Sequence, residues 1–239
     1  MRRAIPFTAL ILLAAFVLSG FSSQEVVVGR RRASAAATTY TLVQKTIWTS
    51  CTTPCAITVS STGSGNLLYV EYGINIGSTY YITGVSSGAC NSAWVIPATA
   101  KASNGSIGTL NSAYCLNSVS GQTSITVTAG HNGYVRIWEQ SASPGPPALD
   151  QCGTVTDSSG SATQLGVAFT LATSSETIHQ SMQSNYHVNS VNAPYGEFDA
   201  SGGLYYGSAD VYNTNSGTAP TFNLGNSAAI AIGSACAFK

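Results

Sequence analysis

The stretch Leu67-Leu68-Tyr69-Val70-Glu71-Tyr72-Gly73-Ile74 decides the fold class of this chain. Every second residue of it carries a large apolar side chain, namely Leu68, Val70, Tyr72 and Ile74. Side chains that alternate with a period of two lie on one face of a β-strand, whereas a helix would need a period of 3.6. The stretch therefore predicts a strand with one apolar face, and Tyr69 and Glu71 on the other.

The same alternation recurs along the chain, as in Ser124-Ile125-Thr126-Val127-Thr128. Turn-forming clusters such as Ser61–Asn66 and Gly130–Gly133 separate these runs, and no helical period follows the first residues. We expect an all-β fold, a single antiparallel β-sandwich over residues 38–239. Residues 141–164, which include Pro144-Gly145-Pro146-Pro147, are expected to form a long connection. The part after them is short for an independent domain, and no internal repeat is evident.

The first residues have the layout of a secretory signal peptide. Arg2 and Arg3 precede an apolar run from Ala4 to Phe21, and small residues follow up to Ser23. We expect a signal peptide over residues 1–23, with a second cleavage option at Ala33-Ser34-Ala35, and a disordered N-terminal segment over residues 24–37. An uncleaved membrane anchor is the alternative. These features predict a secreted or extracellular bacterial protein with no membrane span in its mature chain.

The net charge of zero hides an asymmetry. Five of the nine basic residues and one of the nine acidic residues lie in the first 32 positions. Four basic and eight acidic residues remain from position 33 onward, a net charge of −4. A surface of this kind has no basic stripe, so we expect no nucleic-acid partner.

Six cysteines lie after the leader, an even number that fits an oxidising destination. They are Cys51, Cys55, Cys90, Cys115, Cys152 and Cys236. We predict sequential pairing, 51–55, 90–115 and 152–236, because the first pair brackets a short loop with a proline and the last ties down the C-terminal strand. Zinc binding is not predicted, since no C-x-x-C spacing occurs and the histidines are scattered.

Several segments resemble a loosely defined family of exported bacterial β-sandwich proteins with jelly-roll character and no established activity. The matching pieces are Gly65–Val70, Ile82–Val85, Tyr114, Val119–Val127, Val135–Ser141 and Leu149-Asp150. The resemblance covers about residues 40 to 152 and implies a jelly-roll-like sandwich and export, without any chemistry. Where the family has an Asp-Ser-Ala-Gly-Asn turn, this chain has Ser86–Asn91, so a role tied to that aspartate is absent.

One aromatic row is a candidate binding surface. Tyr134, Arg136 and Trp138 alternate, so they share one face of a strand whose other face carries Val135 and Ile137. On an exposed face the row would stack on sugar rings or on a partner protein. On a face covered by a second sheet, Trp138 would be buried and Arg136 would lie over a ring.

Acidic residues offer a second candidate. Glu197 and Asp199 point the same way if they lie on a strand, and such a pair can serve as acid and nucleophile in a glycoside hydrolase. With Asp210 the pair is also a candidate calcium site. His179 alternates with Ile178 and Met182 and is expected to face water. No cofactor motif is present, and no cofactor is predicted.

These features favour an exported non-catalytic module that binds a glycan or a surface protein. The alternatives are a carboxylate-dependent hydrolase using Glu197 and Asp199, and a structural or assembly component of the cell exterior.

Overall fold

The computed structural model describes residues 37–76, 79–195, 197–200, 205–227 and 229–239. The predicted signal peptide (1–23) and nearly all of the N-terminal segment (24–37) lie outside these residues. Within them the regular structure is β-strand, apart from two single-turn 3-10 helices, η1 (Ser87–Ala89) and η2 (Ala98–Ala100). The all-β prediction is confirmed.

The first half of the chain forms two antiparallel sheets. The first large sheet has the order β1-β9-β4-β7-β6, with β2 also paired to β9, and the first small sheet has the order β3-β8-β5. The strands are β1 (Thr39–Lys45), β2 (Thr49–Cys51), β3 (Cys55–Thr58), β4 (Leu67–Ile74), β5 (Ile82–Val85), β6 (Ala102–Asn104), β7 (Gly108–Cys115), β8 (Ser124–Ala129) and β9 (Gly133–Ser143).

The second half repeats this arrangement. Its large sheet has the order β10-β17-β12-β15-β14 and its small sheet β11-β16-β13, so every strand of the first half except β2 has a counterpart at the same place. The strands are β10 (Leu149–Asp157), β11 (Thr163–Leu165), β12 (Glu176–Ser184), β13 (Val188–Val191), β14 (Glu197–Ala200), β15 (Tyr206–Thr214), β16 (Thr221–Leu224) and β17 (Ala231–Phe238). The chain thus contains one topology twice.

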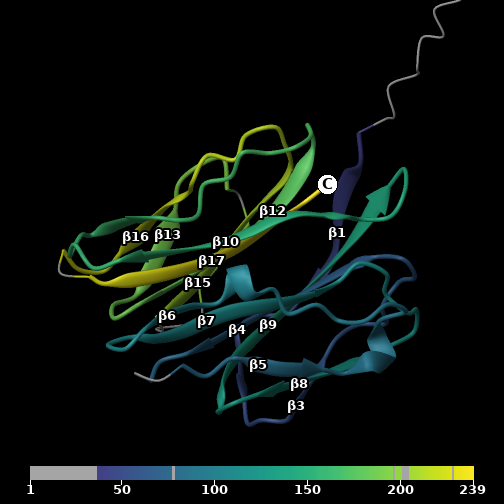
Figure 1. The fold of residues 1–239 in the computed structure, drawn as a ribbon, viewed down its shortest axis with the longest axis horizontal. Coiled ribbons are helices and arrows are strands. Elements are labelled where there is room, and N and C mark those ends of the chain that lie inside the picture. Colours follow the sequence, from purple (N-terminus) through teal and green to yellow (C-terminus); the bar gives the residue numbers. More distant parts are fainter. Residues whose placement is uncertain (1–36, 77–78, 196, 201–204, 228) are drawn as a thin grey trace, which may run out of the picture. The chain divides into compact units, whose positions relative to one another are not determined.

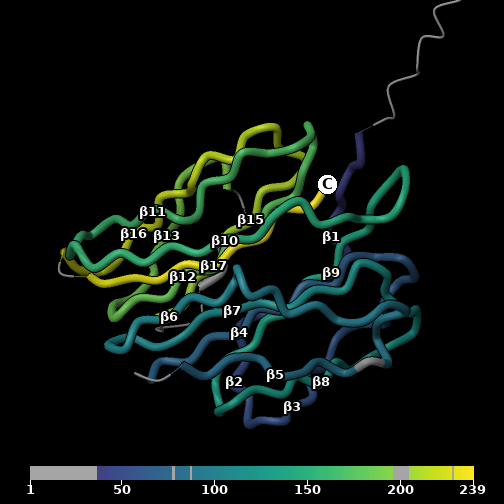
Figure 2. Tube along the Cα trace, viewed as in Figure 1, coloured from purple at the N-terminus to yellow at the C-terminus, as the bar shows by residue number. Residues whose placement is uncertain are grey.

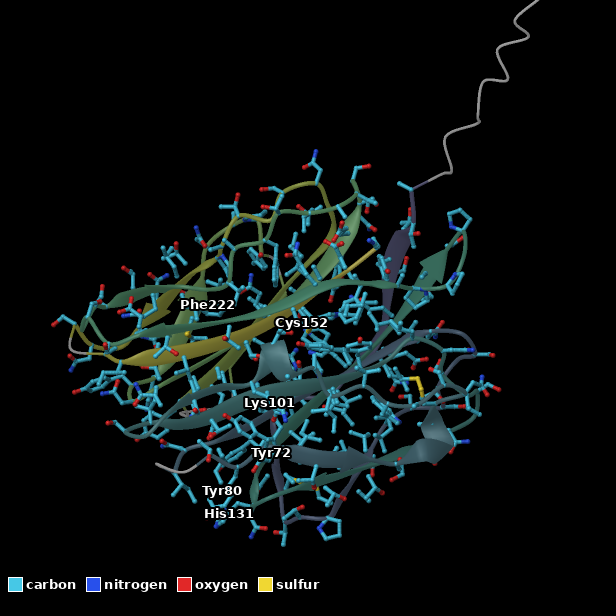
Figure 3. The ribbon with its side chains drawn as sticks, in the orientation of Figure 1. Tyr72, Tyr80, Lys101, His131, Cys152 and Phe222 are labelled. Atoms are coloured by element: carbon cyan, nitrogen blue, oxygen red, sulfur yellow. A yellow bond between two sulfur atoms is a disulfide. The ribbon has the colours of Figure 1, made fainter. Side chains whose placement is uncertain are left out.

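Each half has its own apolar core between its large and its small sheet. In the first half, Leu68, Val70 and Tyr72 of β4 pack against Ile57, Ile125 and Val127 of the small sheet. In the second half, Ile178 and Met182 of β12 pack against Phe222 and Leu224 of β16. Tyr72 and Phe222 mark the two cores in Figure 3. The period-two pattern of residues 67–74 therefore predicted the strand face correctly.

The expectation of a single sandwich was wrong, because the described residues form four sheets in four layers (Figure 1). The expected long connection over residues 141–164 is also wrong. β9 continues to Ser143 and β10 begins at Leu149, so only residues 144–148 link the two halves, as the trace in Figure 2 shows. A proline-rich loop of five residues is enough to join two sandwiches whose large sheets lie face to face.

The two large sheets pack on each other through a mixed interface. Tyr69 and Tyr114 of the first half meet Phe238 of the second edge to face, with ring centroids 5.8 and 5.4 Å apart. Gly73 lets the sheets approach closely, since a Cβ on it would lie 2.5 Å from the ring of Tyr206. Gln183 donates to the backbone oxygens of Ile74 and Ile107 across the same interface.

The cysteines pair as predicted. Disulfides join Cys51 to Cys55, Cys90 to Cys115 and Cys152 to Cys236. The last bridge links β10 to its neighbour β17, so it fastens the first strand of the second half to the final strand of the chain.

Candidate functional site

The predicted aromatic row lies on β9 and faces the second large sheet. Trp138 and Arg136 are fully buried, and Tyr134 is half-buried with its ring 5.3 Å from that of Tyr206. The guanidinium carbon of Arg136 lies 3.7 Å from the centre of the Trp138 ring. The prediction that this row forms an exposed binding platform was therefore wrong, because the second half of the chain covers it.

A histidine and an aspartate form the centre of this buried interface. His179 of β12 places Nδ1 2.5 Å from Oδ1 of Asp210 on β15 and Nε2 3.1 Å from Oε1 of Gln140 on β9. Its ring stacks on Tyr69 at 4.6 Å. The expectation that His179 faces water was wrong, since it is 0% exposed.

The amide of Gln140 orients the contact that it makes with His179. The amide of Gln140 donates to Thr177, so its oxygen accepts and Nε2 of His179 must donate. Burial raises the pKa of Asp210, and the attraction of His179 opposes the shift. The pair ties a strand of the first half to two strands of the second.

Glu71 of β4 is the second buried carboxyl group. Its Oε2 accepts hydrogen bonds from Ser208 Oγ at 2.6 Å and Trp138 Nε1 at 3.3 Å. Burial raises the pKa of Glu71 to about 8, although the charge of Arg136 on the neighbouring strand β9 lowers it. Its other oxygen, Oε1, has no hydrogen-bond partner among the described residues. A neutral Glu71 is consistent with that environment.

This network is closed and suits a structural role. Glu71, Arg136, His179 and Asp210 are each at most 1% exposed, so a substrate would have to separate the two large sheets to reach them. Buried polar groups with several partners hold two elements in one register, because any other docking would leave those groups unsatisfied. We infer that this network fixes the position of the two large sheets on each other.

The predicted acidic site is only partly described. Glu197 and Asp199 lie on edge strand β14, paired with Asp210 and Ser208 of β15, and their side chains lie outside the described part of the chain. Asp210 is buried and bonded to His179, which leaves it unavailable to calcium. No group of three or more His, Cys, Asp or Glu residues suited to a metal was found among the described residues. The role of Glu197 and Asp199 as catalytic acids stays a prediction.

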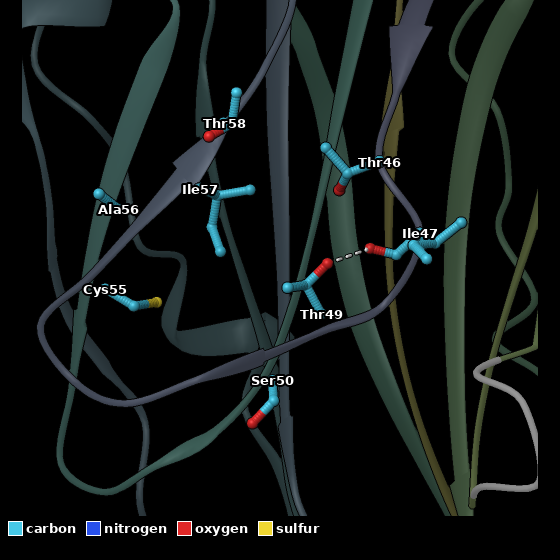
Figure 4. Close-up of a pocket in the computed structure, with 8 residues that line it drawn as sticks. All are labelled: Thr46, Ile47, Thr49, Ser50, Cys55, Ala56, Ile57 and Thr58. Atoms are coloured by element: carbon cyan, nitrogen blue, oxygen red, sulfur yellow. Dashed lines mark hydrogen bonds between the residues drawn. The ribbon is translucent and has the colours of Figure 1, made fainter.

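An open groove lies in the first half, between β2 and β3 (Figure 4). Its volume is about 440 Å³. The chain leaves the first large sheet at Cys51, turns, and enters the first small sheet at Cys55, so the Cys51–Cys55 disulfide closes one end. None of the lining residues is charged; they are Thr46, Ile47, Thr49, Ser50, Cys55, Ala56, Ile57 and Thr58.

Both walls of the groove are strand edges. β2 pairs only with β9, and β3 pairs only with β8, within the described residues. An edge strand turns every second N–H and C=O away from its sheet, so both walls present backbone donors and acceptors that another strand can pair with. Ile57, which belongs to the apolar core, extends from β3 into the space between them (Figure 4).

The neighbouring edge strand β1 is blocked by contrast. Asn213 binds both the N–H and the C=O of Tyr40, and a register shift lies between Leu42 and Gln44. The side chain of Gln44 bonds the N–H and C=O of Ser60, which lies two residues beyond the end of β3. Such bulges and side-chain caps protect an edge against pairing. β2 and β3, which form the walls of the groove, carry no such bulge within their pairing.

Sequence reasoning missed the groove, although one signal was present. The short disulfide loop Cys51–Cys55 was correctly predicted, and a five-residue bridge between two strands allows those strands to diverge. The sequence alone did not show that the two strands join different sheets.

Comparisons with family models, curated proteins and solved structures found no match for this chain. In the described part of the chain, no helix has the length and apolarity needed to cross a bilayer.

Proposed function

We propose that this protein is an exported, non-catalytic module that binds an extended segment of a partner protein along the groove between β2 and β3. The leader is then a signal peptide, and the protein works outside the cell. Three disulfides fit an oxidising compartment, where such bonds persist. We also propose that each half is a jelly-roll-like sandwich. The order of eight strands in two sheets, which occurs in both halves, supports this.

The observation that carries the proposal is the pair of unprotected edges facing one groove. A peptide that enters as a strand forms main-chain hydrogen bonds with an edge, and pockets for alternate side chains give specificity. Among the described strands, β2 has no counterpart in the second half. The wall of the groove that β2 forms is therefore a feature of the first half alone.

The lining defines the chemistry of the partner segment. The lining combines hydroxyl and apolar side chains from both walls, and no charged residue lines the groove. A charged segment would lose hydration without gaining an opposite charge. The best occupant is an uncharged, β-branched segment of about four residues, because β3 has four residues.

A peptide titration tests this proposal. The probe is a capped peptide of alternating threonine and valine, measured by fluorescence anisotropy with the mature protein. The matched control peptide carries a central proline, which removes a backbone donor and cannot pair as a strand.

Substitutions locate the site. Thr49 is exposed on a groove wall, and Thr49→Glu should weaken binding at least tenfold by placing a charge there. Leu165→Glu adds the same charge at an exposed position of the second half and should leave binding unchanged. Equal binding of both peptides, or equal loss in both variants, would refute strand addition in the groove.

A further inference from the structure

We propose that the partner is a second copy of this chain, and that residues 26–28 of one copy add as a strand in the groove of the next. This inference rests on the function proposed for the groove. The segment reads Val26-Val27-Val28 and lies outside the described residues. It belongs to the mature protein when the signal peptide ends at Ser23.

The chemistry of the segment matches the groove. Val26, Val27 and Val28 are three consecutive β-branched residues without charge, the type most favoured in strands. Three such residues fit walls of three and four residues, the lengths of β2 and β3. In a strand the side chain of Val27 points opposite to those of Val26 and Val28, so one face can reach Ile57.

The chain between the segment and the sandwich is long enough to reach a neighbour. Ten residues, 29–38, separate Val28 from the start of β1 at Thr39, and an extended chain of that length spans up to about 33 Å.

The charges next to the donor lie outside the strand itself. Arg30, Arg31 and Arg32 follow the valines after Gly29, and no charged residue lines the groove. The valines can therefore pair with a groove wall while the arginines stay in water.

A donor segment and a groove form a heterologous contact. They are different parts of one chain, so a copy whose donor is bound by a neighbour still offers its own groove. A strand of a few residues buries far less than the ~1,200 Å² of a stable interface, so association should be weak and concentration-dependent.

The experiment measures the mass of the mature protein by light scattering from about 10 μM to about 1 mM, the range of weak association, after its first residue is established by N-terminal sequencing. Wild type should exceed the mass of a monomer as concentration rises. Val27→Glu, which spoils the donor, and Thr49→Glu, which spoils the groove, should each remain monomeric. Leu165→Glu is the charge-matched control and should associate as wild type does.

Mixing the two monomeric variants gives the decisive result. The Thr49→Glu protein keeps its donor and the Val27→Glu protein keeps its groove, so the mixture should form a one-to-one dimer and nothing larger. A mixture that stays monomeric, a wild type that stays monomeric, or a mature chain that begins after residue 28 would each overturn the inference. Binding of the threonine–valine peptide to the Val27→Glu protein would show that the groove still functions when self-association fails.

Discussion

Trp138→Ala tests whether the aromatic row is the interior of a two-part molecule. Trp138 is 0% exposed, its ring carries the guanidinium of Arg136 at 3.7 Å, and its Nε1 donates to Glu71. Truncating a buried tryptophan to alanine costs about 3–5 kcal/mol. Loss of a desolvated cation–π contact adds up to about 2 kcal/mol, so the expected loss in unfolding free energy is about 3–7 kcal/mol.

Urea denaturation followed by circular dichroism measures this loss. The loss is a large part of the ~5–15 kcal/mol typical of a folded protein, so Trp138→Phe serves as a milder variant. It keeps a ring beneath Arg136 but removes the hydrogen bond to Glu71, and should cost about 1–3 kcal/mol. Leu165→Ala, at a side chain 59% exposed, should change stability by less than about 0.5 kcal/mol. A loss below about 1 kcal/mol for Trp138→Ala would refute the buried interface.

Two further predictions concern stability. Burial raises the pKa of Glu71 to about 8, so the folded state binds the Glu71 proton more tightly than the unfolded state does. The contribution of this proton to the free energy of unfolding is therefore fully present below about pH 4.5 and is lost as pH rises through about 8. Urea melts between pH 5 and 9 should show falling stability, and Glu71→Gln, which mimics the neutral acid, should flatten that fall; stability that rises with pH in wild type would contradict the assignment. Chain entropy predicts that replacing Cys152 and Cys236 by serine costs about 4.6 kcal/mol and replacing Cys51 and Cys55 about 2 kcal/mol. The reverse order in thermal melts would show that the bridges act mainly on the folded state.

The strands and disulfides were predictable because local rules determine them. A period of two identifies a strand wherever the chain is half apolar, and an even set of cysteines after a leader suggests bridges. The duplication was not predictable, because the two halves share a strand order but no recognisable sequence pattern. β4 and β12 occupy the same place in their sheets, yet β4 reads LLYVEYGI and β12 reads ETIHQSMQS.

The covering of the second sheet face was also beyond local rules. Alternation separates the two faces of a strand, but it does not say whether the polar face meets water or another sheet. All nine residues of β12 are buried although most are polar, because both faces of the strand are covered. Gln183 finds its partners in the first half, whereas Gln180 bonds Val167 and Tyr195 within the second. His179 and Arg136 therefore resembled surface residues in the sequence and form the interface in the fold.

Amide hydrogen exchange of the mature protein, with and without the threonine–valine peptide at saturation, measures whether the peptide adds as a strand in the groove. Strand addition requires new main-chain hydrogen bonds on at least one groove wall, and such bonds slow exchange. The peptide should slow exchange within Thr49–Cys51 or Cys55–Thr58 and leave exchange along the blocked edge of β1 unchanged. Unchanged exchange across both groove walls with the peptide bound would contradict strand addition in the groove.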